Sequence, residues 1–157
     1  MATLALICGL PGSGKTTLAK QLELSLQALR LCPDEWIAPL LVDSTDTIEL
    51  DRLRSPVESI QWEVAKRALV LGTNVVLEWG FWSQEERIHY RAEAEALGIH
   101  VELHYLEVGR DELWARLSQR NANLPPGTFH ITKEQLDLWW SWFQPPTTDE
   151  LQLQGQH

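Results

Sequence analysis

The chain has 157 residues, of which 44% are apolar, and a formal net charge of −9, which suits a single globular domain with a hydrophobic core. No apolar run reaches the roughly 18 residues of a membrane-spanning helix, and no basic segment precedes the first apolar run as in a secretory signal, so we expect a soluble cytoplasmic domain that does not enter membranes. The 13 Lys and Arg residues are scattered rather than clustered, which disfavours nucleic acid as the partner.

The first predicted elements are a strand, a glycine-rich loop and a helix. Residues 4–8 form a short apolar run that is typical of a buried parallel strand. Residues 9–16 read Gly-Leu-Pro-Gly-Ser-Gly-Lys-Thr and fit the Walker A pattern G-x-x-x-x-G-K-[ST]. Leu18, Leu22 and Leu26 then have the spacing of one face of an amphipathic helix. A strand, a glycine loop and a helix in this order are the context that a phosphate-binding loop requires.

This loop is suited to hold the phosphates of ATP. Glycines let successive backbone N–H groups converge on a phosphate, and the helix that follows adds its positive end. Lys15 is expected to reach the β- and γ-phosphates, and the Thr16 hydroxyl to hold Mg²⁺. No N-K-x-D segment, which reads guanine in GTPases, occurs in the chain. The predicted ATP-binding residues are Gly9, Pro11, Gly12, Ser13, Gly14, Lys15, Thr16 and Thr17.

A second strand is predicted over residues 29–32, and Asp34 follows it directly. Ligands of open α/β sheets lie outside the carboxyl ends of the strands, so Asp34 is expected on the same rim as the phosphate loop. A carboxylate at this place can take the proton of an acceptor hydroxyl during phosphate transfer. From the residues alone, Asp34 as N-cap of a helix that begins at Glu35 is an equally good interpretation.

Three helices are predicted from capping boxes, in which a Ser or Thr precedes a Glu or Gln by three residues. The boxes begin at Ser55, Ser83 and Thr132. Pro56 stands at the first position of the first helix, where proline is well tolerated. The expected helices cover residues 56–72, 84–98 and 133–143.

Glu78 ends the third predicted strand, residues 74–78, which has no polar alternation and is therefore expected to be central. In P-loop proteins a carboxylate at the end of such a strand supports Mg²⁺. Asp is commoner than Glu in this role. A carboxylate at the rim that pairs with a basic neighbour is the alternative.

The last part of the predicted domain contains an edge strand and a basic helix. Polar and apolar side chains alternate over residues 100–108, which indicates a strand near a sheet edge. In the helix predicted over residues 111–121, Arg116 and Arg120 share one face. They suit a lid that closes on transferring phosphate, although the residues alone favour a solvated basic face.

The order of the elements predicts a three-layer α/β P-loop domain of the nucleotide-kinase type, with a parallel sheet of four to five strands. We place this single domain at residues 1–146 and a polar tail at residues 147–157, in which residues 151–153 are the candidate for a fifth strand.

The chain also contains two cysteines and eight tryptophans. The cysteines, at positions 8 and 32, each end an apolar run, which favours buried free thiols in a reducing cytoplasm. Four tryptophans lie near strand ends or the rim, where they can hold a ring-like acceptor or simply pack in the core. These four are Trp36, Trp79, Trp82 and Trp139.

These motifs resemble a known family, the kinase-like P-loop ATP-binding proteins of the AAA_33 type. The family groups with the kinase domain of phage polynucleotide kinase, chloramphenicol phosphotransferase and zeta toxins. The resemblance extends from the loop at 9–17 to the prolines at 145–146, and it includes residues 32–36 and residues 76–82 with Arg87. It implies that Asp34 is the catalytic base, and it favours Arg116 and Arg120 as lid arginines.

We therefore predict an ATP- and Mg²⁺-dependent phosphotransferase that moves the γ-phosphate to a hydroxyl of a small molecule. Polynucleotide-kinase relatives often carry an arginine three residues after the base, and Ile37 stands there in this chain. A polynucleotide or nucleoside 5′-hydroxyl kinase remains open, as does an ATPase switch that phosphorylates nothing. The sequence does not identify the acceptor.

Overall fold

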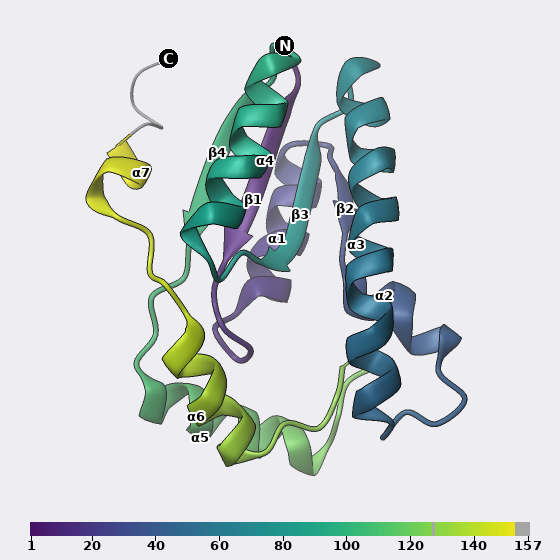
Figure 1. Cartoon of the computed structure of the whole chain (residues 1–157), viewed down its shortest axis with the longest axis vertical. Coiled ribbons are helices and arrows are strands. Elements are labelled where there is room, and N and C mark those ends of the chain that lie inside the picture. Colours follow the sequence, from purple (N-terminus) through teal and green to yellow (C-terminus); the bar gives the residue numbers. More distant parts are fainter. Residues whose placement is uncertain (127, 153–157) are drawn as a thin grey trace.

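Four parallel strands form the central sheet in the order β2-β3-β1-β4. Figure 1 shows the fold in a computed structural model, which describes residues 1–126 and 128–152. The predicted α/β architecture with a parallel sheet is confirmed, and the described residues supply four strands. The strands are β1 (Thr3–Cys8), β2 (Leu29–Leu31), β3 (Val75–Gly80) and β4 (His100–Tyr105).

Helices cover both faces of the sheet, which is why the central strands contain almost only apolar residues. On one face, Ala19 of α1 packs against Ile7 and Val76. On the other, Trp62 and Leu69 of α3 belong to the main hydrophobic core. The helices are α1 (Lys15–Ser25), α2 (Pro33–Ile37), α3 (Thr47–Val70), α4 (Gln84–Ala96), α5 (Arg110–Ala122), α6 (Lys133–Trp142) and α7 (Thr148–Gln152).

Helices α5 and α6 lie beyond the carboxyl ends of the strands, next to the loop that follows β1 (Figure 1). A separate hydrophobic cluster holds them together through Leu113, Leu117 and Leu136. Leu10 of the loop is a member of the same cluster. The fold therefore places the basic helix α5 against the predicted phosphate loop. None of the helices in residues 1–126 and 128–152 is long and apolar enough to cross a membrane.

The predicted start of the long helix at Pro56 is wrong, whereas the other two predicted N-caps, Ser83 and Thr132, are confirmed, the second with a complete capping box. Helix α3 begins at Thr47, and the side chain of Asp46 accepts a 3.0 Å hydrogen bond from the Glu49 backbone N–H. Pro56 lies inside the helix, where the missing N–H and the ring cost about 3 kcal/mol in an isolated helix. The 24-residue helix tolerates this proline because one of its faces is buried in the core. The capping side chains of Ser83 and Thr132 accept hydrogen bonds as expected.

Part of the predicted polar tail, residues 148–152, is helical in the structure. Leu151 and Gln152 belong to helix α7, so they do not form a fifth strand, and Leu153 lies outside the described residues. Strand β4 also ends at Tyr105, three residues earlier than expected. Helix α7 is attached through Glu150, whose carboxylate accepts from Arg87 Nε at 2.8 Å and from Nη2 at 3.3 Å.

Glu150→Gln is expected to lower the free energy of unfolding by about 3 kcal/mol, because it leaves the buried Arg87 guanidinium without its counter-charge. Arg87 is 2% exposed, and its Nη1 also donates to the Phe81 carbonyl at 2.8 Å. Denaturant unfolding measures the loss. Glu63→Gln is the matched control, since Glu63 is 69% exposed and its pairing with Lys66 is expected to contribute less than about 1 kcal/mol.

The loss is also expected to depend on pH. Burial raises the pKa of Glu150, but hydrogen bonds from Arg87 and Thr147 outweigh it and hold the pKa below the ordinary 4.5. The ion pair therefore stabilises the fold above pH 4.5, and this contribution is lost as the pH falls through the lowered pKa. Wild type and variant should converge in acid, and an equal gap at all pH values would contradict the role of this ion pair.

Candidate active site

The glycine loop has a backbone shape that only glycine adopts without strain. Gly12 and Gly14 have φ angles of 86° and 98°, in the left-handed region. A Cβ on Gly12 would lie 3.0 Å from Leu117 of α5, and one on Gly9 would lie 2.6 Å from the Ser13 hydroxyl. The loop is thus tightly folded between the sheet and α5.

The loop offers polar groups without partners, as an anion site requires. The hydroxyl of Ser13, a residue only 5% exposed, has no hydrogen-bond partner among the described residues. Gly14 caps α1 without a side-chain hydrogen bond, so N–H groups of its first turn remain available. Burial lowers the pKa of Lys15, although the Asp34 and Glu78 carboxylates oppose this shift. The loop therefore fits the phosphates of a nucleotide.

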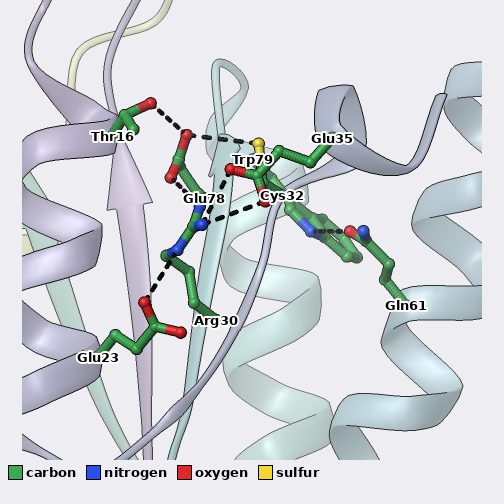
Figure 2. A network of polar contacts seen from close by, with 8 residues as sticks. All are labelled: Thr16, Glu23, Arg30, Cys32, Glu35, Gln61, Glu78 and Trp79. Atoms are coloured by element: carbon green, nitrogen blue, oxygen red, sulfur yellow. Dashed lines mark hydrogen bonds and ion pairs between the residues drawn. The ribbon is translucent and has the colours of Figure 1, made fainter. Parts of the chain in front are cut away.

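Glu78 at the end of β3 lies beside the loop and is held by three side chains (Figure 2). Its Oε2 accepts from the Thr16 hydroxyl at 2.7 Å and from the Cys32 thiol at 3.4 Å, while its Oε1 accepts from Arg30 Nη1 at 3.1 Å. Burial, strengthened by Glu78, raises the pKa of Cys32 to about 12, so this thiol keeps its proton. Glu78 thus pairs with a basic neighbour, Arg30, and also contacts Thr16, the predicted magnesium ligand; its support of Mg²⁺ stays a prediction.

Asp34 lies in the first turn of α2 and does not cap it. The N-cap is Cys32, with Pro33 at the first helical position, so the capping interpretation of Asp34 is wrong. Its carboxylate Oδ1 instead accepts from Arg54 Nη2 of α3 at 2.7 Å. Ile37 is fully buried. An arginine therefore does stand beside Asp34, supplied by α3 rather than by position 37.

Two further carboxylates, Glu58 and Glu86, lie near the ion pair of Asp34 and Arg54. Burial, together with Glu86 and Asp34, raises the pKa of Glu58 to about 7. Burial also raises the pKa of Glu86. Sequence reasoning missed Arg54 and Glu58. Their spacing of four residues puts them on one face of a helix. The predicted helix begins at Pro56, after Arg54, so the sequence does not indicate that the two residues share a face.

The two arginines of α5 have different surroundings. Arg116 donates to the Gly12 carbonyl at 3.3 Å and to Glu112 at 2.7 Å, so it rests on the loop. Burial lowers the pKa of Arg120, while Asp34 opposes this shift. The buried Arg120 Nε has no hydrogen-bond partner among the described residues. Arg120 is thus a cation near Asp34 with donor capacity to spare.

Three of the tryptophans predicted near the rim have different surroundings. Trp79 is buried, donates to Gln61 Oε1 at 2.9 Å and stacks on Phe81. Trp82 donates to the Gly9 carbonyl at 3.3 Å and therefore supports the phosphate loop. Trp36 on α2 is 38% exposed. Of these three rings, only that of Trp36 is substantially open to solvent.

Comparisons with known proteins show the family and the fold of this chain. The AAA_33 family model, described as an AAA domain, matches residues 4–146. A provisionally named kinase from Chloroflexus aurantiacus has a similar structure, with a TM-score of 0.75 and 20% identity over 92% of this chain and 78% of that one. For Kti12 of Chaetomium thermophilum, solved with ADP-AlF3, the TM-score is 0.68, with 18% identity over 92% and 81% of the two chains.

A gluconokinase from Sinorhizobium meliloti 1021 is similar at a TM-score of 0.61, with 16% identity over 94% of this chain and 78% of the gluconokinase. A search of curated proteins found no match. Identities this low establish the fold alone. The family model, however, covers most of the chain, from the first strand to the prolines after α6. The chain therefore belongs to the AAA_33 family and has the fold of a kinase-like P-loop protein.

Proposed function

We propose that the protein is an ATP- and Mg²⁺-dependent phosphotransferase that moves the γ-phosphate of ATP to a hydroxyl of a small molecule. The observation that carries the proposal is the convergence of Lys15, Asp34 and Arg120 at one rim. Lys15 directly follows the glycine loop, and α5 contacts this loop through Arg116 and Gly12. Burial lowers the pKa of both Lys15 and Arg120, and the Asp34 carboxylate opposes this shift, which favours their charged forms. A carboxylate base and two cations around a phosphate loop are the groups that phosphate transfer needs.

The donor half of the site consists of the loop, Thr16 and Glu78. Bound Mg·ATP supplies the phosphoryl group and the cation that neutralises its charge. Residues 9–17 hold the phosphates through backbone N–H groups, and Lys15 neutralises them. The Thr16 hydroxyl donates a 2.7 Å hydrogen bond to Glu78, so the lone pairs of the Thr16 oxygen stay available for Mg²⁺. In this arrangement Glu78 acts through Thr16 and not as a direct ligand.

The acceptor half centres on Asp34. Arg54 occupies Oδ1, so Oδ2 is available to orient an acceptor hydroxyl and to take its proton. Arg120 of α5 is the cation that stabilises charge on the transferring phosphate, and Arg116 holds α5 on the loop. Asp34 thus keeps the role of base, and Arg116 and Arg120 keep the role of lid arginines, that the sequence predicts. Arg54 is a further residue of the site, which orients the base.

The chemistry near Asp34 favours a hydroxyl-bearing small molecule. Burial raises the pKa of Glu58 to about 7, so Glu58 can donate or accept a hydrogen bond with a further hydroxyl of the acceptor. The acidic net charge of −9 disfavours a long polyanion. Ile37 stands where polynucleotide-kinase relatives often carry an arginine, which disfavours an acceptor that bears a phosphate. Arg54 weakens this argument, because it supplies a cation beside Asp34 that can bind such a phosphate. A 5′-hydroxyl polynucleotide kinase therefore stays the second candidate.

Incubation with γ-labelled ATP and Mg²⁺ tests the function, with three acceptor conditions side by side. The conditions are a small-metabolite fraction of a cell extract, a 5′-hydroxyl oligonucleotide and no acceptor. We expect label to move into a small molecule. Label on the oligonucleotide would establish the second candidate. Slow phosphate release that no acceptor stimulates would establish the ATPase switch.

A further inference from the structure

Arg30 contacts three carboxylates at this site. It lies on the edge strand β2, and its side chain is 11% exposed. Its Nε donates to Glu23 of α1 at 3.3 Å, its Nη1 to Glu78 of β3 at 3.1 Å, and its Nη2 to both oxygens of Glu35 of α2 at 2.9 and 3.1 Å. All three guanidinium nitrogens are therefore used, each toward a different element (Figure 2).

This arrangement fixes the orientation of Glu78. One carboxylate oxygen receives the Arg30 hydrogen bond, and the other receives those of Thr16 and Cys32. Since donors on both oxygens oppose rotation, Oε2 stays directed at the Thr16 hydroxyl. The Thr16 and Cys32 contacts alone leave Oε1 unbound in a residue that is only 6% exposed, which is costly for a carboxylate.

We propose that Arg30 is a positioning residue for magnesium binding: it holds Glu78 in the orientation in which Glu78 directs the Thr16 hydroxyl toward the cation. The proposal rests on the proposed ATP and Mg²⁺ site. Arg30 touches neither nucleotide nor metal and acts through Glu78 and Thr16. Groups that orient a metal ligand in this way typically change metal affinity about 10- to 100-fold when they are removed.

Binding of a fluorescent ATP analogue, measured with Mg²⁺ and with EDTA, tests the proposal without any acceptor. The quantity of interest is the ratio of the two dissociation constants. Arg30→Met is expected to lower this Mg²⁺-dependent gain about tenfold. Its affinity in EDTA should stay near the wild-type value, because the loop and Lys15 are untouched. A merely structural role would weaken binding in both conditions alike.

Two controls separate position from charge. Arg52→Met removes an equal charge from an exposed site that pairs with Glu49, and Glu35→Gln alters the cluster while the contact between Arg30 and Glu78 remains. Both should keep the wild-type ratio. Arg30→Lys retains the charge but cannot span three carboxylates, so its ratio should fall several-fold, by less than that of Arg30→Met.

The outcomes are distinct. An unchanged or larger Mg²⁺-dependent gain in Arg30→Met would overturn the proposal, since three unneutralised carboxylates would then attract the cation without any need for orientation. If Arg30→Met does not fold, as a thermal scan would reveal, Arg30→Lys decides, and a wild-type ratio in that variant refutes positioning. A wild-type protein that does not bind the analogue at all would instead refute the proposed function.

Discussion

Lys15→Ala is expected to weaken nucleotide binding severely and to abolish phosphate transfer with it. Removing one partner of a desolvated charge pair costs about 2–5 kcal/mol, which corresponds to at least about thirtyfold in Kd. Lys15 belongs to the loop motif itself, and the spare donor capacity of Ser13 and Arg120 does not replace its charge at the phosphates. Titration with the fluorescent ATP analogue measures the loss, and Lys20→Ala, exposed on the same helix, is the control.

The stability of this variant distinguishes lost binding from lost folding. Burial lowers the pKa of Lys15, so its charge opposes folding while no anion is bound. Ligand-free Lys15→Ala should therefore melt at or above the wild-type temperature. In contrast, ATP should raise the melting temperature of the wild type only. Tight ATP binding by Lys15→Ala would show that the loop does not bind phosphate in the proposed way.

Asp34→Asn is expected to leave ATP binding intact and to remove phosphate transfer. An amide of nearly the same shape keeps an oxygen for the Arg54 hydrogen bond, which is 2.7 Å long in the wild type, but it cannot take a proton. Loss of a general base lowers the rate about 10²- to 10⁴-fold. The measurement is transfer of label from γ-labelled ATP to the acceptor, with analogue binding recorded on the same preparation.

Glu35→Gln is the matched control for this substitution, because Glu35 is the adjacent carboxylate on α2 but belongs to the Arg30 cluster. It should retain transfer. Asp34→Asn with wild-type transfer would refute Asp34 as the base. A joint loss of transfer and analogue binding would mean that Asp34 supports the donor half instead.

Local sequence signals predicted the elements whose cause is itself local. The N-cap hydrogen bonds of Ser83 and Thr132 form within one helical turn, as expected, and Thr132 forms the complete capping box with Gln135. The glycine loop was predictable because its backbone shape depends on the glycines themselves. The start of α3 was not, because the burial of a long helical face outweighs the local signal of Pro56.

The contacts that complete the candidate site join residues far apart in the chain. Thr16 and Glu78 are 62 positions apart, Arg30 and Glu78 are 48 apart, and Asp34 and Arg54 are 20 apart. The sequence around Arg30, a single arginine in an apolar segment, does not indicate which carboxylate it will contact. Which carboxylate it meets depends on strand order and helix placement, which set the distances between elements.

The glycine loop and the α/β architecture can be predicted from the sequence, as can the placement of Asp34 and Glu78 after strands, because glycine conformations and apolar runs act over a few residues. The side chains that contact these two carboxylates, and the attachment of α7 through Glu150, become apparent in the folded structure. Arg30, Arg54 and Arg87 each find their partners through the packing of separate elements. Packing at that range leaves no local pattern, since the free energy comes from burying whole faces.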